Sequence, residues 1–447
     1  MAKQEASNAT GEYVEDMKYE GTLSIEHRAY LIDRHGTAEL DPVPCMDDND
    51  PLNWPTRKKI INLLLVAFHA MMAAFISASI QCAFVDIAAD LHVSVQRTSY
   101  LSSLMIAILG GGPLLWQPLS HVYGRRPIFL LSLLLSGVAN VGCAVSHSYA
   151  SMAVCRALIA IFISPAASIG SGVVTETFFK KERARYMGIW TIMVTLGVPL
   201  APFIFGFVAM RVGYRWIYWI LSMVNAVQLI LYFFLGPETR YIPSPTPTPK
   251  KSYISELFTF RRIDPTPLHL LDFVRPLFMV VRPCIAIPAA TYAMIHLWGS
   301  IMASILIPQI FPTQFNLNTQ QIGLQQGGTI IGTVLGEQIG GYLSDIWMLR
   351  RARRGKFPEP EYRLWLSYIG HALTICGVVV FIVQIHNASH QWNVTPIVGA
   401  GIASAGNQVV TTVMITYAVD CYRPESASVG VFITFVRQIW CFIGPFW

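Results

Sequence analysis

The chain reads Pro118-Leu119-Ser120-His121-Val122-Tyr123-Gly124-Arg125-Arg126-Pro127 where an apolar stretch gives way to a short basic loop. A related sequence, Gly341-Tyr342-Leu343-Ser344-Asp345, recurs in the second half of the chain, and Arg350 and Arg351 follow it. Two copies of one loop, each at the exit of an apolar segment, indicate a duplicated bundle of membrane helices. Secondary transporters are built in this way, with two halves that rock about a site near the middle of the membrane.

The composition also indicates a membrane protein. Hydrophobic residues make up 53% of the 447 residues and charged residues only 13%, whereas soluble proteins carry about 25% charged residues. The net charge of +6 does not predict a nucleic-acid partner, because the basic residues gather in loops beside the apolar segments, where they set the orientation of membrane helices. The eight cysteines have no paired or metal-type spacing, so we interpret them as small packing residues.

Eleven apolar segments are long enough to cross a bilayer, which takes about 20 residues in a helix. Six of them precede a long central loop and five follow it. They lie near residues 60–84, 97–119, 128–147, 150–175, 187–210, 215–236, 285–311, 322–345, 364–385, 395–418 and 427–447. The predicted fold is an all-α polytopic membrane protein with two pseudo-symmetric six-helix halves, of which the second lacks its last helix.

This pattern divides the chain into four parts. We expect a disordered cytosolic tail over 1–57, a helix bundle over 58–236, a cytosolic central loop over 237–283 and a second bundle of five spans over 284–447. Basic residues cluster before the first span and after the second, fourth and eighth, so the positive-inside rule places the N-terminus in the cytosol, and we expect the plasma membrane as the location. Repeat symmetry predicts a twelfth helix beyond Trp447; a short gene model and a natural truncation both explain why it is missing.

Several short sequences resemble the major facilitator superfamily, and its fungal drug:proton antiporters in particular. The loop around Gly124 resembles the superfamily signature, and Gly197 through Ala201-Pro202 to Gly206 resembles the antiporter motif of the fifth span. Three further sequences are similar to fungal members: Asp50-Pro51-Leu52-Asn53-Trp54-Pro55, Pro237-Glu238-Thr239 and Thr416-Tyr417-Ala418-Val419-Asp420-Cys421-Tyr422. The resemblance covers about residue 20 to the end and implies exchange of a small molecule for protons.

The resemblance also implies gating residues in the two copies of the basic loop. In the family, an acidic residue two positions before the tyrosine pairs across helices and holds one conformation of the transporter. Here that position is His121, which is mostly uncharged at neutral pH and cannot supply a carboxylate. The second copy keeps Asp345, which we predict to be a structural carboxylate. Arg125 is the remaining predicted gating residue.

The fifth span combines small residues with two prolines. Gly197, Ala201 and Gly206 present small surfaces at near-helical spacing, so a neighbouring helix can approach closely. Pro199 and Pro202 remove backbone donors and favour a kink. Ordinary helix packing explains this pattern, and the resemblance implies a role in the geometry of antiport.

Few charges lie inside the predicted spans, and such charges are functional candidates because they are costly in a membrane. Arg156 in the fourth span fits the arginine that the family associates with proton coupling, although Ala160 stands where the family has glycine. Glu337 and Arg437 fall at similar depths, so they could form either a structural salt bridge or a proton-coupled switch. Polar residues that could line a cavity are His296, Trp298, Asn407 and Gln408.

Two glycosylation acceptor sequences test the predicted orientation. Asn387-Ala388-Ser389 and Asn393-Val394-Thr395 lie between the ninth and tenth spans, in a loop predicted to be external, so we expect sugar on Asn387 and Asn393. Asn8-Ala9-Thr10 has the same pattern but belongs to the predicted cytosolic tail. It should therefore remain unmodified.

The sequence favours a secondary transporter over an enzyme. It contains neither a phosphate-binding loop nor a His-Glu-x-x-His pair, so ATP-driven transport and metalloprotease chemistry are not expected. We predict a monomer that exports small organic molecules in exchange for protons, with no cofactor, metal or nucleic acid, its partners being the substrate, protons and the lipid bilayer. The alternatives are a proton-coupled importer of a nutrient or polyamine, and a truncated, non-transporting remnant.

Overall fold

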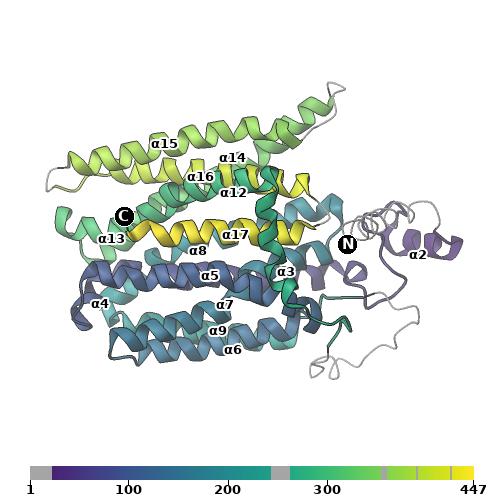
Figure 1. Ribbon diagram of the computed structural model, residues 1–447, viewed down its shortest axis with the longest axis horizontal. Helices are drawn as coiled ribbons and strands as arrows, with labels where there is room; N and C mark the ends of the chain where they lie inside the picture. The colour runs from purple at the N-terminus through teal and green to yellow at the C-terminus, as the bar shows by residue number, and fades with distance from the viewer. Residues whose placement is uncertain (1–22, 243–261, 354–359, 389–390, 423–424, 447) are drawn as a thin grey trace.

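The computed structural model describes residues 23–242, 262–353, 360–388, 391–422 and 425–446. Over these ranges every regular element is a helix, and none is a strand. The long helices lie side by side in one bundle, with the N-terminal half in the lower part of Figure 1 and most of the C-terminal half in the upper part. The predicted all-α membrane fold is confirmed.

The first half of the chain contributes six long helical segments. The first consists of α3 (Thr56–Ala78), a 3₁₀ turn (Gln81–Ala83) and α4 (Phe84–Asp90). The other five are α5 (Val95–Tyr123), α6 (Arg125–Ala144), α7 (Tyr149–Thr177), α8 (Lys180–Val212) and α9 (Arg215–Leu235).

The second half contributes five segments. The first consists of α12 (Pro283–His296), a π-helical turn (Leu297–Ile301) and α13 (Met302–Phe315). The other four are α14 (Thr319–Arg353), α15 (Leu364–His386), α16 (Thr395–Cys421) and α17 (Ser426–Ile443), which a short 3₁₀ turn (Gly444–Phe446) follows.

The eleven predicted spans coincide with these helices, but not all of them are equally apolar. In the described part of the chain, nine helical segments are long and apolar enough to cross a membrane. The two remaining predicted spans are α14 and α17. α14 has 35 residues but carries several glutamines and Glu337, which lower its hydropathy, and the described apolar stretch of α17, Ser428–Ile443, is short.

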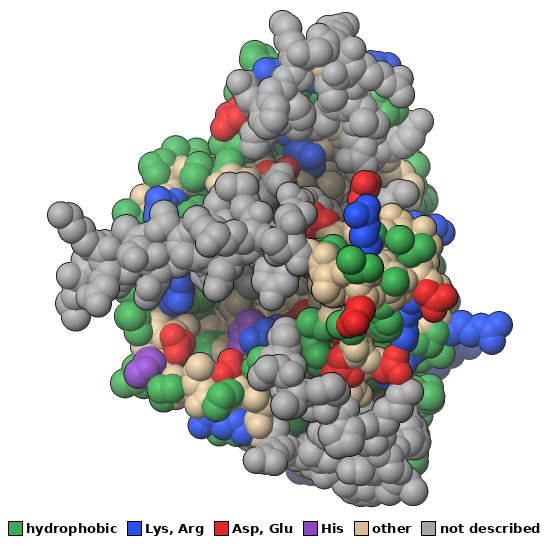
Figure 2. Space-filling model, turned by 90° about the vertical axis from the view of Figure 1, so that its right-hand side faces the viewer, with side chains coloured by type: hydrophobic (Ala, Val, Ile, Leu, Met, Phe, Trp, Pro, Cys, Tyr) green, Lys and Arg blue, Asp and Glu red, His purple; other side chains and the backbone are tan. Residues whose placement is uncertain are grey.

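One end of the bundle, which we call the basic end, holds the start of α3, the turn at Gly124, the α7–α8 junction and the end of α14. Figure 2 views the molecule from this side and shows Lys, Arg, Asp and Glu side chains mixed over the face. We call the other end, where Gly213 and Phe446 lie, the opposite end.

Residues 23–57 differ from the predicted disordered tail. They contain α2 (Ile25–His35), whose first turn is capped by the Ser24 hydroxyl, which accepts a hydrogen bond from the His27 N–H at 3.1 Å. The His35 ring packs edge-on against Phe179 with 5.3 Å between centroids. Arg34 donates to the Asn53 carbonyl at 2.9 Å. The Arg34 contact lies within the segment, and the His35 contact holds it against the basic end. Residues 1–22 lie outside the described part.

The central loop is also partly helical. It contains α11 (Leu270–Val274) and a 3₁₀ segment, Arg275–Val281. The N–H groups of Ile263 and Asp264 donate to the Val122 carbonyl at the end of α5, at 2.9 and 3.2 Å. On the other side, Arg275 pairs with Glu425 at 2.9 Å just before α17. The described part of this loop therefore joins the two halves at the basic end.

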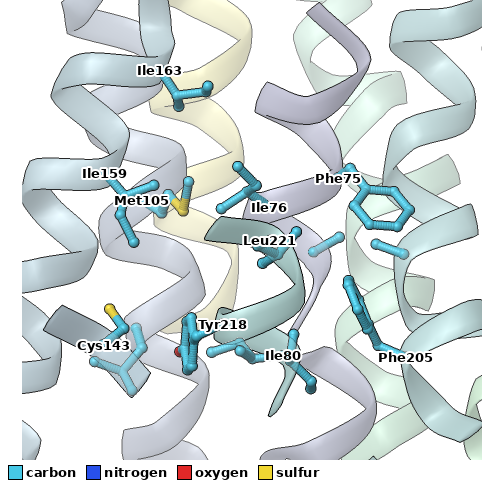
Figure 3. Close-up of a cluster of buried hydrophobic side chains, with 14 of the residues drawn as sticks. Phe75, Ile76, Ile80, Met105, Cys143, Ile159, Ile163, Phe205, Tyr218 and Leu221 are labelled. Atoms are coloured by element: carbon cyan, nitrogen blue, oxygen red, sulfur yellow. The ribbon is translucent and has the colours of Figure 1, made fainter. Parts of the chain in front are cut away.

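Aromatic and aliphatic side chains fill the interior of the first half (Figure 3). Phe75 of α3 and Phe205 of α8 meet edge to face with 5.3 Å between centroids. Met105, Ile159 and Tyr218 bring α5, α7 and α9 to the same cluster. Since edge-to-face rings stabilise beyond the area they bury, this core holds α8 in a fixed position against α3.

The two halves meet along a seam that is closed at the opposite end. The side chain of Thr319 at the start of α14 donates to the Asp86 carboxylate of α4 at 2.9 Å. Tyr100 of α5 stacks on Phe446 with 4.8 Å between ring centroids. Figure 1 shows α5 and α17 running next to each other along this seam. At the opposite end the two halves are therefore in direct contact.

Candidate functional site

The loop between α5 and α6, around Gly124, forms a tight turn at the basic end. Gly124 has a φ of 94°, which L side chains rarely adopt, and a side chain there would collide with the Glu238 carboxylate. That carboxylate accepts the backbone N–H groups of Arg125 at 2.8 Å and Arg126 at 3.0 Å. Burial raises the pKa of Glu238, while these N–H groups and that of Arg240 act in the opposite direction. Glu238 thus caps the start of α6.

The guanidinium of Arg125 pairs with a second carboxylate. Its Nη2 lies 2.8 Å from Oε1 of Glu176 near the end of α7, and its Nη1 donates to the Ser120 hydroxyl. The Thr239 hydroxyl donates to the other Glu176 oxygen at 2.9 Å. Arg125 therefore links α5, α6 and α7 to the segment after α9. Sequence reasoning did not select Glu176 or Glu238 as site residues, although Glu238 lies in a quoted motif.

His121 lies beside this network. Its half-buried ring is within electrostatic reach of Arg125, Arg240 and Asp264. Asp264 belongs to the central loop, and its carboxylate lies 3.9 Å from Arg240. The other predicted gating residue, Asp345, lies in α14, but its side chain is outside the described residues. Its role as a structural carboxylate stays a prediction.

The predicted antiporter motif packs α8 against helices of both halves. A Cβ atom at Gly197 would lie 2.6 Å from the Met71 carbonyl of α3. On α14, a Cβ at Gly323 would collide with the Pro202 carbonyl, and one at Gly206 would lie 3.1 Å from the Gly323 Cα. Gly197 therefore permits close packing within the first half, whereas Pro202 and Gly206 lie on the seam between the halves.

Arg156 is fully buried in the first half of the bundle. Its Nε donates to the Leu101 carbonyl at 3.2 Å, its Nη2 to the Ser77 carbonyl at 3.1 Å, and its Nη1 contacts the Tyr218 hydroxyl at 3.5 Å. No carboxylate of the described residues forms an ion pair with it. The guanidinium thus joins α3, α5, α7 and α9 through neutral acceptors.

Glu337 and Arg437 do not pair with each other in the described structure. Oε2 of Glu337 accepts hydrogen bonds from the Gln408 amide at 2.5 Å and the Thr412 hydroxyl at 3.2 Å, both on α16. Nη1 of Arg437 donates to the Tyr292 hydroxyl of α12 at 2.9 Å. Similar depth along two helices did not predict contact, because depth does not fix the direction in which a side chain points.

Three of the four predicted cavity residues divide between these two charges. Gln408 binds Glu337, whereas Asn407 and His296 lie next to each other on the Arg437 side. Trp298 lies in the π-helical turn after His296 and packs against a small apolar cluster around Cys441. The structure therefore brings His296, Asn407 and Arg437 together, and places Gln408 with Glu337.

The predicted glycosylation sites lie at the opposite end. Asn387 directly follows α15, and Asn393 precedes α16; both are exposed. Oδ1 of Asn393 accepts hydrogen bonds from the backbone and hydroxyl of Thr395 at 3.1 and 2.8 Å. Asn8 lies outside the described residues. The basic end and the two acceptor asparagines therefore lie at different ends of the bundle, and which end faces the cytosol stays a prediction.

Comparisons with known proteins agree with this architecture. The family model of the Major Facilitator Superfamily matches residues 63–445. The chain is 27% identical to the "Uncharacterized transporter mfc1" of Schizosaccharomyces pombe, over 89% of this chain and 85% of that protein. It is also 27% identical to the "MFS-type transporter atr4" of Stereocaulon alpinum, covering 88% and 72%, and to the "Efflux pump vrtL" of Penicillium aethiopicum, covering 88% and 79%. The family match extends over most of the helical bundle, and the protein belongs to the Major Facilitator Superfamily of membrane transporters.

Proposed function

We propose that the protein exports small organic molecules across the plasma membrane in exchange for protons, with its basic end in the cytosol. The family match supports secondary transport, and one similar fungal protein bears the name efflux pump. The positive-inside rule supports the orientation. In this orientation the contacts between the halves at the opposite end would lie on the outer side.

The observation that carries proton coupling is the environment of Glu337. This half-buried carboxylate lies inside the bundle and accepts hydrogen bonds from two neutral side chains, Gln408 and Thr412. Among the described residues, no Lys or Arg pairs with it. Protonation can therefore remove its charge without breaking an ion pair. The charged carboxylate favours the conformation that exposes it to water, and the protonated form favours the conformation that buries it.

The test is export from cells that express the full chain. Cells are loaded with a panel of fluorescent organic anions, neutral molecules and cations, and the retained dye is measured with and without a protonophore. Expression should reduce retention of at least one class, and the protonophore should abolish that reduction. Greater accumulation in expressing cells would instead indicate the importer. No difference for any compound would contradict transport of these classes.

A matched pair of variants separates coupling from folding. Glu337→Gln keeps the side-chain shape but cannot take up a proton, so gradient-driven export should be lost. Glu26→Gln changes an exposed carboxylate on α2 and should export like the wild type. Equal protonophore sensitivity of the Glu337→Gln variant and the wild type would remove Glu337 from the proposal.

A further inference from the structure

One charge inside the second half has no ionic partner among the described residues. Arg437 of α17 is half-buried and makes one hydrogen bond, from Nη1 to the Tyr292 hydroxyl at 2.9 Å, while its Nε has no partner there. The Tyr292 ring lies beside the guanidinium, 5.8 Å from ring centroid to Cζ. Arg156 differs, because carbonyl groups and Tyr218 engage its donors and it is fully buried.

Two polar side chains, His296 and Asn407, lie next to each other on one side of this guanidinium. The His296 ring lies 5.7 Å from the Tyr292 ring and within electrostatic reach of Arg437. Asn407 is 5% exposed and adjoins His296, but neither its Oδ1 nor Nδ1 of His296 has a partner with full hydrogen-bond geometry among the described residues. Leaving such groups unpaired in a buried site is costly. A bound molecule with hydrogen-bonding groups would satisfy them.

The position of this cluster fits a transported molecule. Counting about 1.5 Å per residue, Arg437 lies roughly 16 Å from the start of α17, close to the middle of a bilayer core about 30 Å thick. The next residue, Gln438, touches the seam: its Cβ would lie 2.8 Å from a Cβ at Gly110 of α5. Ile106 of α5 packs in one cluster with Leu297, which follows His296, and with Cys441, which lies one helical turn after Arg437. The first half of the bundle therefore reaches the neighbourhood of the cluster.

The backbone beside the cluster is irregular in a way that is frequent at functional sites. α12 ends at His296 and continues as a π-helical turn through Leu297–Ile301, and such turns occur often where a helix carries a functional residue. Gly299 in this turn lets α16 approach, because a Cβ there would lie 3.1 Å from the Asn407 Cβ. The turn therefore brings α12 and α16 together beside the cluster.

We propose that Arg437, Tyr292, His296 and Asn407 form the recognition site for an organic anion, a carboxylate or phenolate on an aromatic or otherwise apolar body. The guanidinium supplies charge and a donor fork for the oxygens. His296 and Asn407 supply the polar groups that fix the orientation. Trp298 and the apolar side chains around Cys441 adjoin the site and suit an apolar body. This proposal deepens the proposed export function, since it names the substrate class.

The test is ligand binding to the purified full chain, measured as the shift of its thermal unfolding. Three probes of the same size are compared: 1-naphthoate, the neutral 1-naphthamide and the cationic 1-naphthylmethylammonium. Saturable stabilisation by naphthoate is expected, with at least tenfold weaker binding of the other two. Arg437→Gln should weaken naphthoate binding at least tenfold, and Arg437→Lys should retain part of it because the charge remains.

Two controls keep the result interpretable. Arg211→Gln removes an exposed arginine at the end of α8 and should bind naphthoate like the wild type. His296→Gln keeps a hydrogen-bonding side chain and should weaken binding less than His296→Phe does. If Arg437→Gln does not fold, the wild-type preference among the three probes and the His296 pair decide the question.

The outcomes separate this site from the export proposal. Equal affinity for all three probes, or naphthoate binding unchanged in a folded Arg437→Gln variant, overturns the anion site while cellular export of other classes can stand. Naphthoate binding that depends on Arg437, together with absence of export in cells, supports the anion site and contradicts the export proposal.

Discussion

Gly206 of α8 and Gly323 of α14 bring the two halves of the bundle into backbone contact. A Cβ atom at Gly206 would lie 3.1 Å from the Gly323 Cα and 3.1 Å from the Thr319 carbonyl. In a membrane, small residues of this kind allow helices to pack where larger side chains would hold them apart. The contact closes the seam at the opposite end, and so belongs to one of the two states between which a rocking transporter changes.

Gly206→Val should shift the protein away from this closed state, because the added isopropyl group has no space between α8 and α14. The measurement is the reaction of a cysteine placed at Phe203, next to Gly327 on the seam, with a membrane-impermeant maleimide. A several-fold faster reaction is expected. Gly188→Val is the control on the same helix, where an added Cβ meets nothing within 4 Å. Identical labelling in both variants would show that the glycine contact does not hold the seam.

Glu176→Gln should loosen the basic end, because it removes the charge that pairs with Arg125 at 2.8 Å. Hydrogen bonds to charged groups contribute about 1.5–3 kcal/mol. The variant should therefore unfold at a lower temperature in detergent and transport more slowly. Arg125→Lys should have a similar effect, since an ammonium group cannot replace the guanidinium at Glu176 and Ser120 together. Glu26→Gln, on exposed α2, should leave both quantities unchanged; a Glu176→Gln protein as stable as this control would contradict the role given to the pair.

Arg156→Ala should destabilise the first half rather than act on transport alone. The substitution removes the two hydrogen bonds from the guanidinium to the Leu101 and Ser77 carbonyls, and a hydrogen bond to a charged group contributes about 1.5–3 kcal/mol. Folded yield by fluorescence-detected gel filtration should fall, and Arg156→Lys should recover part of it. Normal yield with transport lost would instead favour the proton-coupling role that the family resemblance implies.

The sequence predicts the helices well, because an apolar stretch of membrane length has few alternatives to a helix. It does not predict which side chains meet. Asn407 and Gln408 are adjacent in sequence, yet one turns toward His296 and the other toward Glu337, since successive helical residues point about 100° apart. Arg437 could be identified as an embedded charge, but its contact with Tyr292 depends on how α17 and α12 are rotated, which a hydropathy pattern does not fix.

The partners of the basic loop were missed for a related reason. Glu176 lies near the end of α7 and Glu238 lies just after α9, so both carboxylates are far from Arg125 in the sequence. Only the three-dimensional packing of these helix ends brings the carboxylates together. The folded segment over 23–57 was missed because it is polar, and polar composition favours disorder; its order depends on contacts with the basic end, such as that of His35 with Phe179.

Glycosylation tests the orientation of the whole bundle. Asn387 is exposed at the opposite end, so it should carry sugar if that end is external, and digestion with a deglycosylating enzyme should increase gel mobility. Asn387→Gln should remove most of this shift. Asn393 should contribute less, because its side chain already bonds Thr395 next to the start of α16. Asn8→Gln should have no effect; loss of sugar in that variant would invert the proposed orientation.

The central claim is that substrate and protons move in opposite directions through a bundle whose proton acceptor is Glu337. It is tested most directly by purified protein in liposomes that contain a pH-sensitive dye. Addition outside of a substrate identified by the export screen should make the interior more alkaline, because inward movement of substrate expels protons. The Glu337→Gln variant should give no pH change. Acidification of the interior in the wild type, or substrate flux without any pH change, would contradict proton antiport.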